Sequence, residues 1–250
     1  MLYLKRFKQF ESKDTYHQVF DVNMVTLYKV ADKIYAVVCP DNNLRNMIFC
    51  RFQEHYESST PLFQGKHFKM PDYVNWYKTE FSKKSNFTYP QDWAGFNLPS
   101  ESIENCLSGI QDETDWDIMM KSIIQTIRNE ESDKFYLLGV ANIDMGGEDV
   151  LDHEIHHGMY YTDTSYKETM DRMINQMDPK DKEAIAKSII ETGYAESVIM
   201  DEIGAYLTTG LIDGMENLGL EKYIDTFKKV FQEFFNKHVK GLKRIKINWI

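Results

Sequence analysis

The sequence predicts an α+β protein in which a mixed N-terminal region contains a small sheet and the C-terminal region is mostly helical. Residues 21–39 and 134–140 are rich in β-branched and aromatic side chains, which is typical of strands. Beyond about residue 110, apolar side chains recur every three or four positions, which is the period of an amphipathic helix. The sequence therefore predicts an N-terminal region of unassigned role, residues 1–110, and a C-terminal region with the candidate site, residues 111–250.

The first strands form a predicted hairpin, because residues 21–39 place β-branched side chains on both sides of a short Ala-Asp-Lys turn. Asp41 or Asn42 then has the short polar side chain that caps a helix. The same signals predict helices over residues 42–56 and 71–81, a loop over residues 93–99, and a helix beginning at Ser100.

The C-terminal region begins with the clearest amphipathic helix, over residues 114–129. The apolar run KFYLLGV follows at residues 134–140 and predicts a buried strand. A loop containing Gly146 and Gly147 comes next, since paired glycines favour turns and loops.

The remainder of the chain is predicted to be helical. One helix begins near Glu148 or Asp149, and later helices cover residues 166–177, 179–191, 198–208 and 218–239. In the last of these, aromatic and aliphatic side chains repeat at helical spacing, which indicates core packing.

An excess of acidic residues counts against nucleic-acid binding. The chain carries 39 acidic and 29 basic residues, giving a formal charge of −10, whereas nucleic-acid binders normally present a basic face. The basic cluster at residues 237–246 is interpreted as the solvated end of the last helix, where cations are favoured. We therefore expect no nucleic-acid partner. The oligomeric state is not predicted.

The cysteines and the hydropathy predict a cytoplasmic protein. Cys39, Cys50 and Cys106 are an odd set without CxxC spacing, which fits reduced thiols better than disulfides. Basic residues interrupt the first ten positions, so these lack the apolar core of a signal peptide. No uncharged apolar run approaches the roughly 18 residues that cross a bilayer, so we expect no membrane association.

The candidate site lies in the segment LDHEIHHGMY, residues 151–160. His153, Glu154 and His157 form an HExxH pattern, and positions i and i+4 of a helix lie on the same face. His153 and His157 can therefore bind one metal ion through ring nitrogens at about 2.0–2.1 Å. Glu154 points about 100° further round the helix, where it can accept a proton from a water on that metal without being a ligand.

A third protein ligand is expected, because catalytic zinc usually has three. Glu202 is the best candidate, since it is an acidic residue inside the apolar helical stretch MDEIGAYL, and an unpaired buried charge would be costly. The alternative for Glu202 is a surface acid paired with a lysine. His156 is interpreted as a residue that contacts a ligand or the substrate, or as a plain surface residue.

These motifs resemble those of the HExxH zinc metallopeptidases called zincins, most closely the gluzincin branch. In that branch a glutamate on a following helix is the third ligand, and the segment DEIGA at residues 201–205 is similar to its second motif. Forty-four residues separate His157 from Glu202, a spacing that such a family allows. The strand at residues 135–140 also resembles the edge strand that borders the substrate cleft in zincins. The likeness covers about residues 134–207.

The resemblance implies one Zn²⁺ per chain, held by His153, His157 and Glu202, on a zincin-like active-site helix. It implies a peptidase that hydrolyses peptide or protein substrates with Glu154 as the general base. The cleft is then expected between the helix of His153 and the helix of Glu202.

Two positions depart from the family pattern. In thermolysin-like members an aspartate orients a ligand histidine, and Tyr206 stands at that position here, so Asp201 is the candidate for the role. Another zincin branch takes a third ligand six residues after the second histidine, where this chain has Asp163. That branch has glycine at the position of Tyr160, so Asp163 is ranked second. The oxyanion-stabilising residue stays open among Tyr160, Tyr161, Tyr194, Tyr206 and His238.

Two other functions stay open. Glu154 and His157 also form an ExxH pair of the kind found in di-iron carboxylate enzymes, but those sites need two such pairs and the chain has one. A metal-stabilised, zincin-like binding protein without activity would have a closed site of four ligands, with His156 or Asp163 joining, and would not need Glu154.

Overall fold

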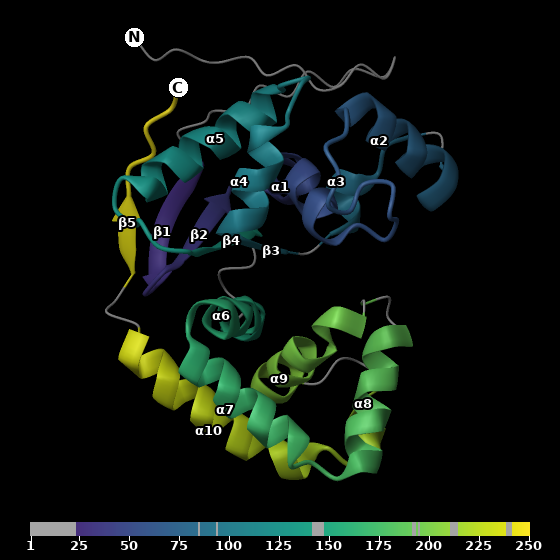
Figure 1. The fold of residues 1–250 in the computed structure, drawn as a ribbon, viewed down its shortest axis with the longest axis vertical. Helices are drawn as coiled ribbons and strands as arrows, with labels where there is room; N and C mark the ends of the chain where they lie inside the picture. The colour runs from purple at the N-terminus through teal and green to yellow at the C-terminus, as the bar shows by residue number, and fades with distance from the viewer. Residues whose placement is uncertain are drawn as a thin grey trace.

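The structure is a computed structural model that describes residues 24–84, 86–93, 95–141, 148–191, 194, 196–210, 215–238 and 242–250. It confirms the predicted α+β class, because a mixed five-stranded sheet lies among helices (Figure 1). The strands are β1 (Thr26–Ala31), β2 (Ile34–Cys39), β3 (Phe96–Pro99), β4 (Tyr136–Ala141) and β5 (Lys243–Ile245). The helices are α1 (Asn42–Glu57), α2 (Met70–Trp76), α3 (Tyr89–Asp92), α4 (Ser100–Ser108), α5 (Asp115–Arg128), α6 (Glu148–Thr162), α7 (Thr164–Asn175), α8 (Pro179–Glu191), α9 (Ile199–Thr209) and α10 (Glu221–His238).

The strand order in the sheet is β3-β4-β2-β1-β5. β1 and β2 form the predicted antiparallel hairpin, and β2 runs parallel to β4. β3 pairs with β4 and β5 pairs with β1, both antiparallel, so β3 and β5 are the two edges. Every residue of β2 and β4 is buried, as expected for strands that are covered on both faces.

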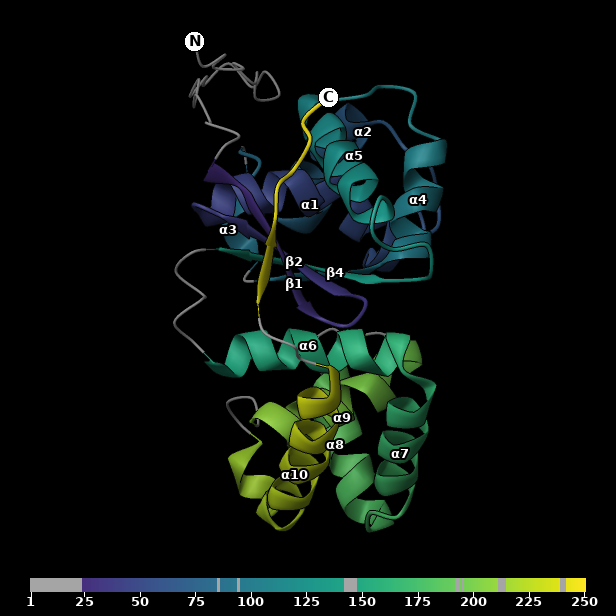
Figure 2. The same cartoon turned by 90° about the vertical axis from the view of Figure 1, so that its left-hand side faces the viewer.

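Helices cover both faces of the sheet. α1 to α5 lie on one face, whereas α6 lies along the other face with α7 to α10 beyond it (Figure 2). Side chains of β2 alternate between two hydrophobic cores, with Tyr35 and Val37 in the first and Ile34 and Ala36 in the second. The sheet therefore separates two hydrophobic cores, one packed against α1 to α5 and the other packed against α6.

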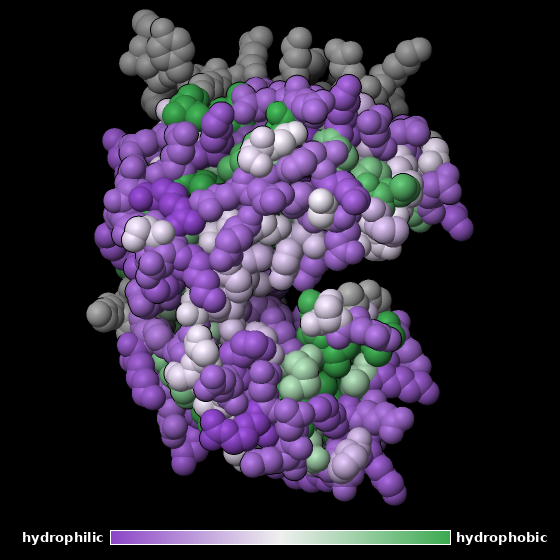
Figure 3. Space-filling model, viewed as in Figure 1, coloured by the Kyte–Doolittle hydropathy of each residue, from purple (hydrophilic) through white to green (hydrophobic). Residues whose placement is uncertain are grey.

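The division predicted near residue 110 does not coincide with the division between these cores. α5 and β4 contribute Trp116, Ile123 and Leu137 to the first core, and Ile245 of β5 joins them. The chain leaves the sheet after Ala141 and returns to it with β5. We call residues 148–238 the helical half, and residues 24–141 with 242–250 the sheet half. The surface is deeply hollowed between the two halves (Figure 3).

Three predictions about individual elements are wrong. Residues 93–99, predicted as a loop, contain β3, which forms because β4 offers an unpaired edge. β4 is not an edge strand, since it lies between β3 and β2, and its apolar residues suit that central place. The basic cluster at residues 237–246 is not one helix end, because α10 ends at His238 and Lys243 lies on β5, 2.8 Å from Glu130.

Parts of several predictions lie outside the described residues. They include the start of the hairpin at residues 21–23, the loop with Gly146 and Gly147, the last residue of the predicted helix 218–239, and residues 239–241 of the basic cluster. Within the described ranges, none of the helices combines the length and apolar character that crossing a membrane requires.

Candidate metal centre

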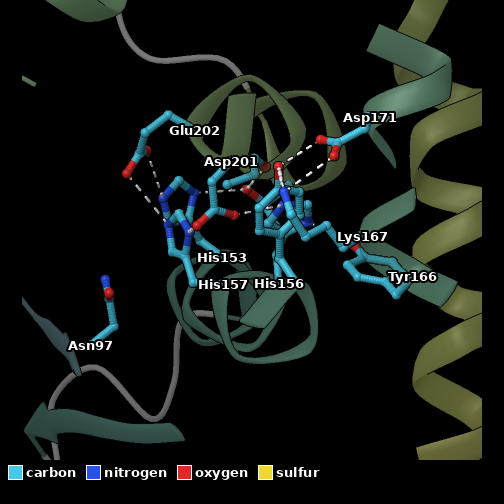
Figure 4. Close-up of polar contacts among 12 residues, drawn as sticks. Asn97, His153, His156, His157, Tyr166, Lys167, Asp171, Asp201 and Glu202 are labelled. Atoms are coloured by element: carbon cyan, nitrogen blue, oxygen red, sulfur yellow. Dashed lines mark hydrogen bonds and ion pairs between the residues drawn. The ribbon is translucent and has the colours of Figure 1, made fainter. Parts of the chain in front are cut away.

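α6 and α9 bring His153, His157 and Glu202 together. α6 presents both histidines one turn apart, with their ring centroids 4.9 Å apart, and α9 packs against it. Glu202 Oε2 lies 3.7 Å from His153 Nε2, and Glu202 Oε1 lies 3.6 Å from His157 Nε2. One possible ligand atom from each residue lies within 4.8 Å of the other two. All three side chains point into one space between the helices (Figure 4).

The donor atoms fit a zinc ion in spacing and in kind. Two ligands at about 2.0–2.1 Å from a tetrahedral zinc lie about 3.4 Å apart, close to the separations between Glu202 and the histidines. Glu202 Oε2 is buried without a hydrogen-bond partner among the described residues, although burying such an atom is costly. His153 is the most exposed of the three, with 17% of its side chain accessible, so the cluster is open on that side.

Asp201 orients His157. Asp201 Oδ2 lies 3.0 Å from His157 Nδ1, which leaves Nε2 of the same ring facing Glu202. Burial opposes a charge on His157, but Asp201 and Glu202 outweigh it and raise the pKa of the imidazole to about 10. Burial also opposes the charge on Asp201, but His157 and His156 hold its pKa well below the usual range. The carboxylate is therefore ionised and accepts the proton on Nδ1 of His157. At neutral pH the metal-free ring also carries a proton on Nε2, which a metal ion bound there would displace.

Thr209 has the corresponding position beside His153, and the sequence analysis did not find it. Its hydroxyl donates to the carbonyl of Ala205, one turn earlier in α9, at 2.8 Å. The lone pairs of the same oxygen face His153 Nδ1 at 3.3 Å. Nδ1 of His153 thus has a hydrogen-bonding partner on α9, and Nε2 of the same ring faces Glu202. The seven-residue interval between Glu202 and Thr209 places both on one face of α9, which was the available signal.

Glu154 points at the sheet and not into the metal cluster. Glu154 is 9% exposed, and its carboxylate accepts a hydrogen bond at 2.8 Å from the side-chain amide of Asn97 on β3. It is close enough to His157 to favour the charged form of that imidazole. The geometry therefore places a carboxylate beside the cluster without making it a ligand. Asn97 lies in the stretch predicted as a loop, so sequence reasoning missed it.

His156 is fully buried and does not reach the metal cluster. Its Nδ1 lies 2.7 Å from the hydroxyl of Tyr166 on α7, and its Nε2 lies 3.4 Å from Asp201 Oδ1. Burial lowers the pKa of His156, although Asp201 opposes this, so the ring is neutral. α9 approaches closely because Gly204 faces the ring: a Cβ there would lie 2.7 Å from His156 Cε1. The buried side chain of His156 therefore contacts both α7 and α9 from its place on α6.

Two other predicted residues lie elsewhere. The hydroxyl of Tyr160 donates to Asp171 on α7 at 2.6 Å. Asp163 caps the N-terminus of α7, where it accepts hydrogen bonds from the amides of Ser165 and Tyr166. Its second oxygen lies 2.8 Å from His238 Nε2. The structure therefore does not bring Asp163 to the His153–His157 pair.

Two of the tyrosines that are candidates for oxyanion stabilisation border the cluster. The ring of Tyr206 lies 4.9 Å from the ring of His153, and its hydroxyl is 3.2 Å from the hydroxyl of Tyr194. Burial raises the pKa of both phenols, so they are neutral donors at ordinary pH. The ring of Tyr161, at the end of α6, instead lies 5.3 Å from the ring of Tyr136, tilted by 42°. Tyr194 and Tyr206 are therefore the two candidates that lie beside the metal cluster.

Comparisons with known proteins add no family to this description. No protein-family model matches the chain, and no curated protein or solved structure is significantly similar to it.

Proposed function

We propose that the protein is a zinc-dependent peptidase that hydrolyses peptide or protein substrates. The observation that carries this proposal is the convergence of His153, His157 and Glu202 on one space, with Glu154 beside it. Two imidazoles and one carboxylate are a ligand set of catalytic zinc sites, which keep a position free for water or substrate. The zincin resemblance of the HExxH and DEIGA segments supports the same assignment.

Zinc bound there would act as a Lewis acid that polarises a peptide carbonyl and lowers the pKa of water. Glu154 would take the proton of the attacking water and pass it to the nitrogen of the leaving amine. Tyr194 or Tyr206 would donate a hydrogen bond to the oxyanion that forms from the carbonyl oxygen. The hollow between the two halves would admit the peptide (Figure 3).

The two alternative functions have less support. A closed structural site would need a fourth ligand, but His156 contacts Tyr166 and Asp201, and Asp163 caps α7. A di-iron enzyme would need further carboxylates, and the only possible metal group among the described residues is His153, His157 and Glu202. These contacts favour a single metal ion with an open coordination position.

Zinc content and Glu154→Gln test this proposal. Purified protein should contain about one zinc per chain by elemental analysis and should cleave members of a peptide library scored by mass spectrometry. Glu154→Gln should keep the zinc and lose roughly 10²- to 10⁴-fold in rate, the usual contribution of a general base. Glu168→Gln, the same change at an exposed position of α7, is the control and should leave both unchanged. Two irons per chain, or full activity of Glu154→Gln, would contradict the proposal.

A further inference from the structure

The carboxylate of Glu154 is held from the sheet half, whereas the residues of the metal cluster all come from the helical half. Asn97 Nδ2 on the edge strand β3 donates to Glu154 Oε2 at 2.8 Å. Asn97 approaches from the side of the sheet, and the residues of α6 and α9 lie opposite (Figure 4). The N-terminal part of the chain, which had no assigned role, therefore reaches the residue proposed as general base.

Tyr136 fixes which way the Asn97 amide points. Its hydroxyl donates to Asn97 Oδ1 at 2.6 Å, so the oxygen of the amide must face Tyr136 and the NH₂ group must face Glu154. The sheet register produces this contact, because Asn97 pairs with Leu138 and Tyr136 lies two residues earlier on the same face of β4. Burial raises the pKa of Tyr136 well above its ordinary value, so the hydroxyl keeps its proton.

Gly95 restricts the other oxygen of Glu154. A Cβ at position 95 would lie 3.2 Å from Glu154 Oε1, so the main chain just before β3 approaches this oxygen closely. One oxygen of the carboxylate thus carries a hydrogen bond, and the other lies close to the main chain at Gly95, where a Cβ would make a tight contact. The two contacts together hold Glu154, which is 9% exposed, in one position.

We propose that Asn97, oriented by Tyr136, is a positioning residue that aligns the Glu154 carboxylate for proton transfer. This inference rests on the proposed function. The proton moves from the attacking water to Glu154 and then to the leaving nitrogen, so the carboxylate returns to its starting state and no other reactant is needed. The helical half binds the metal and the sheet half aligns the base, which makes the two contributions separable by mutation.

Asn97→Ala and Asn97→Asp test the alignment. Both remove the donor, and Asn97→Asp keeps the shape and the oxygen that accepts from Tyr136. Each should lower kcat about 10- to 100-fold, the usual effect of losing a partner that orients a site residue, while KM changes little. Zinc content should stay at the wild-type value, because no metal-cluster contact is touched. Asn175→Ala, an exposed asparagine at the end of α7, is the control and should match wild type.

Tyr136→Phe separates positioning from a general structural role. It should lower kcat about threefold to tenfold, the usual effect of one neutral hydrogen bond, and it should have no further effect in the Asn97→Ala background. A second readout needs neither metal nor activity. In ¹⁵N-labelled metal-free protein, the side-chain amide protons of Asn97 should shift in Glu154→Ala and in Tyr136→Phe, whereas those of Asn175 should not.

The outcomes distinguish this inference from the proposed function. If wild-type protein binds zinc and cleaves peptides but Asn97→Ala and Asn97→Asp keep full kcat, positioning by Asn97 is wrong and the peptidase assignment stands. Loss of zinc in parallel with activity, or additive effects of Tyr136→Phe and Asn97→Ala, would show a structural role and overturn the inference. A wild-type protein without hydrolysis would overturn both.

Discussion

Replacement of Glu202 by Gln is the sharpest perturbation of the candidate metal centre. Glutamine keeps the length and the hydrogen-bonding carbonyl of the side chain but removes the charge. Each carboxylate oxygen of Glu202 faces one of the two histidines of the cluster, at 3.6 Å and 3.7 Å, and Oε2 has no hydrogen-bond partner among the described residues. Its principal role would therefore be to bind the metal, and zinc affinity should respond to its loss more than any other property.

The size of the effect follows from the number of ligands. Four-ligand zinc sites bind with about 10–16 kcal/mol, so one ligand contributes about 3–4 kcal/mol. Since 1.4 kcal/mol is tenfold in affinity, Glu202→Gln should weaken zinc binding by roughly 10²- to 10³-fold. The assay is competition with a chromophoric zinc chelator at fixed pH and salt.

Glu196→Gln is the matched control, because it removes the same charge from an exposed position in the turn that precedes α9. It should bind zinc as wild type does. If Glu202→Gln bound zinc within threefold of wild type, Glu202 would not be a ligand, and the assignment of the third position would be refuted.

Two further predictions concern the residues around the cluster and the first core. Gly204→Ala would place a Cβ 2.7 Å from the ring of buried His156. It should therefore lower the free energy of unfolding by about 1–3 kcal/mol, despite the better helix propensity of alanine. A raised melting temperature would contradict this close packing of Gly204 against His156. Burial raises the pKa of Glu54 to about 7, so protonated Glu54 stabilises the fold fully below about pH 4.5, and this stabilisation is lost as pH rises through 7. The loss amounts to about 3 kcal/mol, at about 1.4 kcal/mol per pH unit, and Glu54→Gln should remove this pH dependence. Urea denaturation of the metal-free wild type and of Glu54→Gln at pH 5 and pH 8 measures the difference. Equal pH dependence of the two proteins would show that Glu54 titrates normally.

The sequence predicted those helices and strands whose apolar side chains repeat at a clear helical or strand spacing. α1, α5 and α9 match their predicted ranges within about two residues, because an apolar stripe and a capping residue are both visible in the sequence. β3 and β5 were missed because their residues, FNLP and KRI, carry no strand period. These strands form because β4 and β1 offer free edges, and such pairing partners lie far away in the sequence.

In the candidate site, too, local patterns could be predicted and contacts between distant residues could not. Helical spacing was enough to place His153 and His157 on one face, and the cost of a buried charge was enough to select Glu202. The partners of these residues were harder to find. Asn97 lies 57 residues before Glu154, and Thr209 lies 56 residues after His153, so neither contact leaves a local pattern. Asp201 could be named only as a candidate, since nothing in the sequence shows which histidine it faces.

β5 joins the sheet only after the whole helical half has been synthesised. It pairs with β1, and the amides of Asn248 and Ile250 then donate to the hydroxyls of Thr126 and Ser122 on α5. A nascent chain on the ribosome therefore has β1 without its β5 partner while α6 to α10 emerge, and unpaired edges are templates for pairing with other chains. A variant that lacks residues 242–250 would keep every residue of the metal cluster but would expose the edge of β1 that β5 covers.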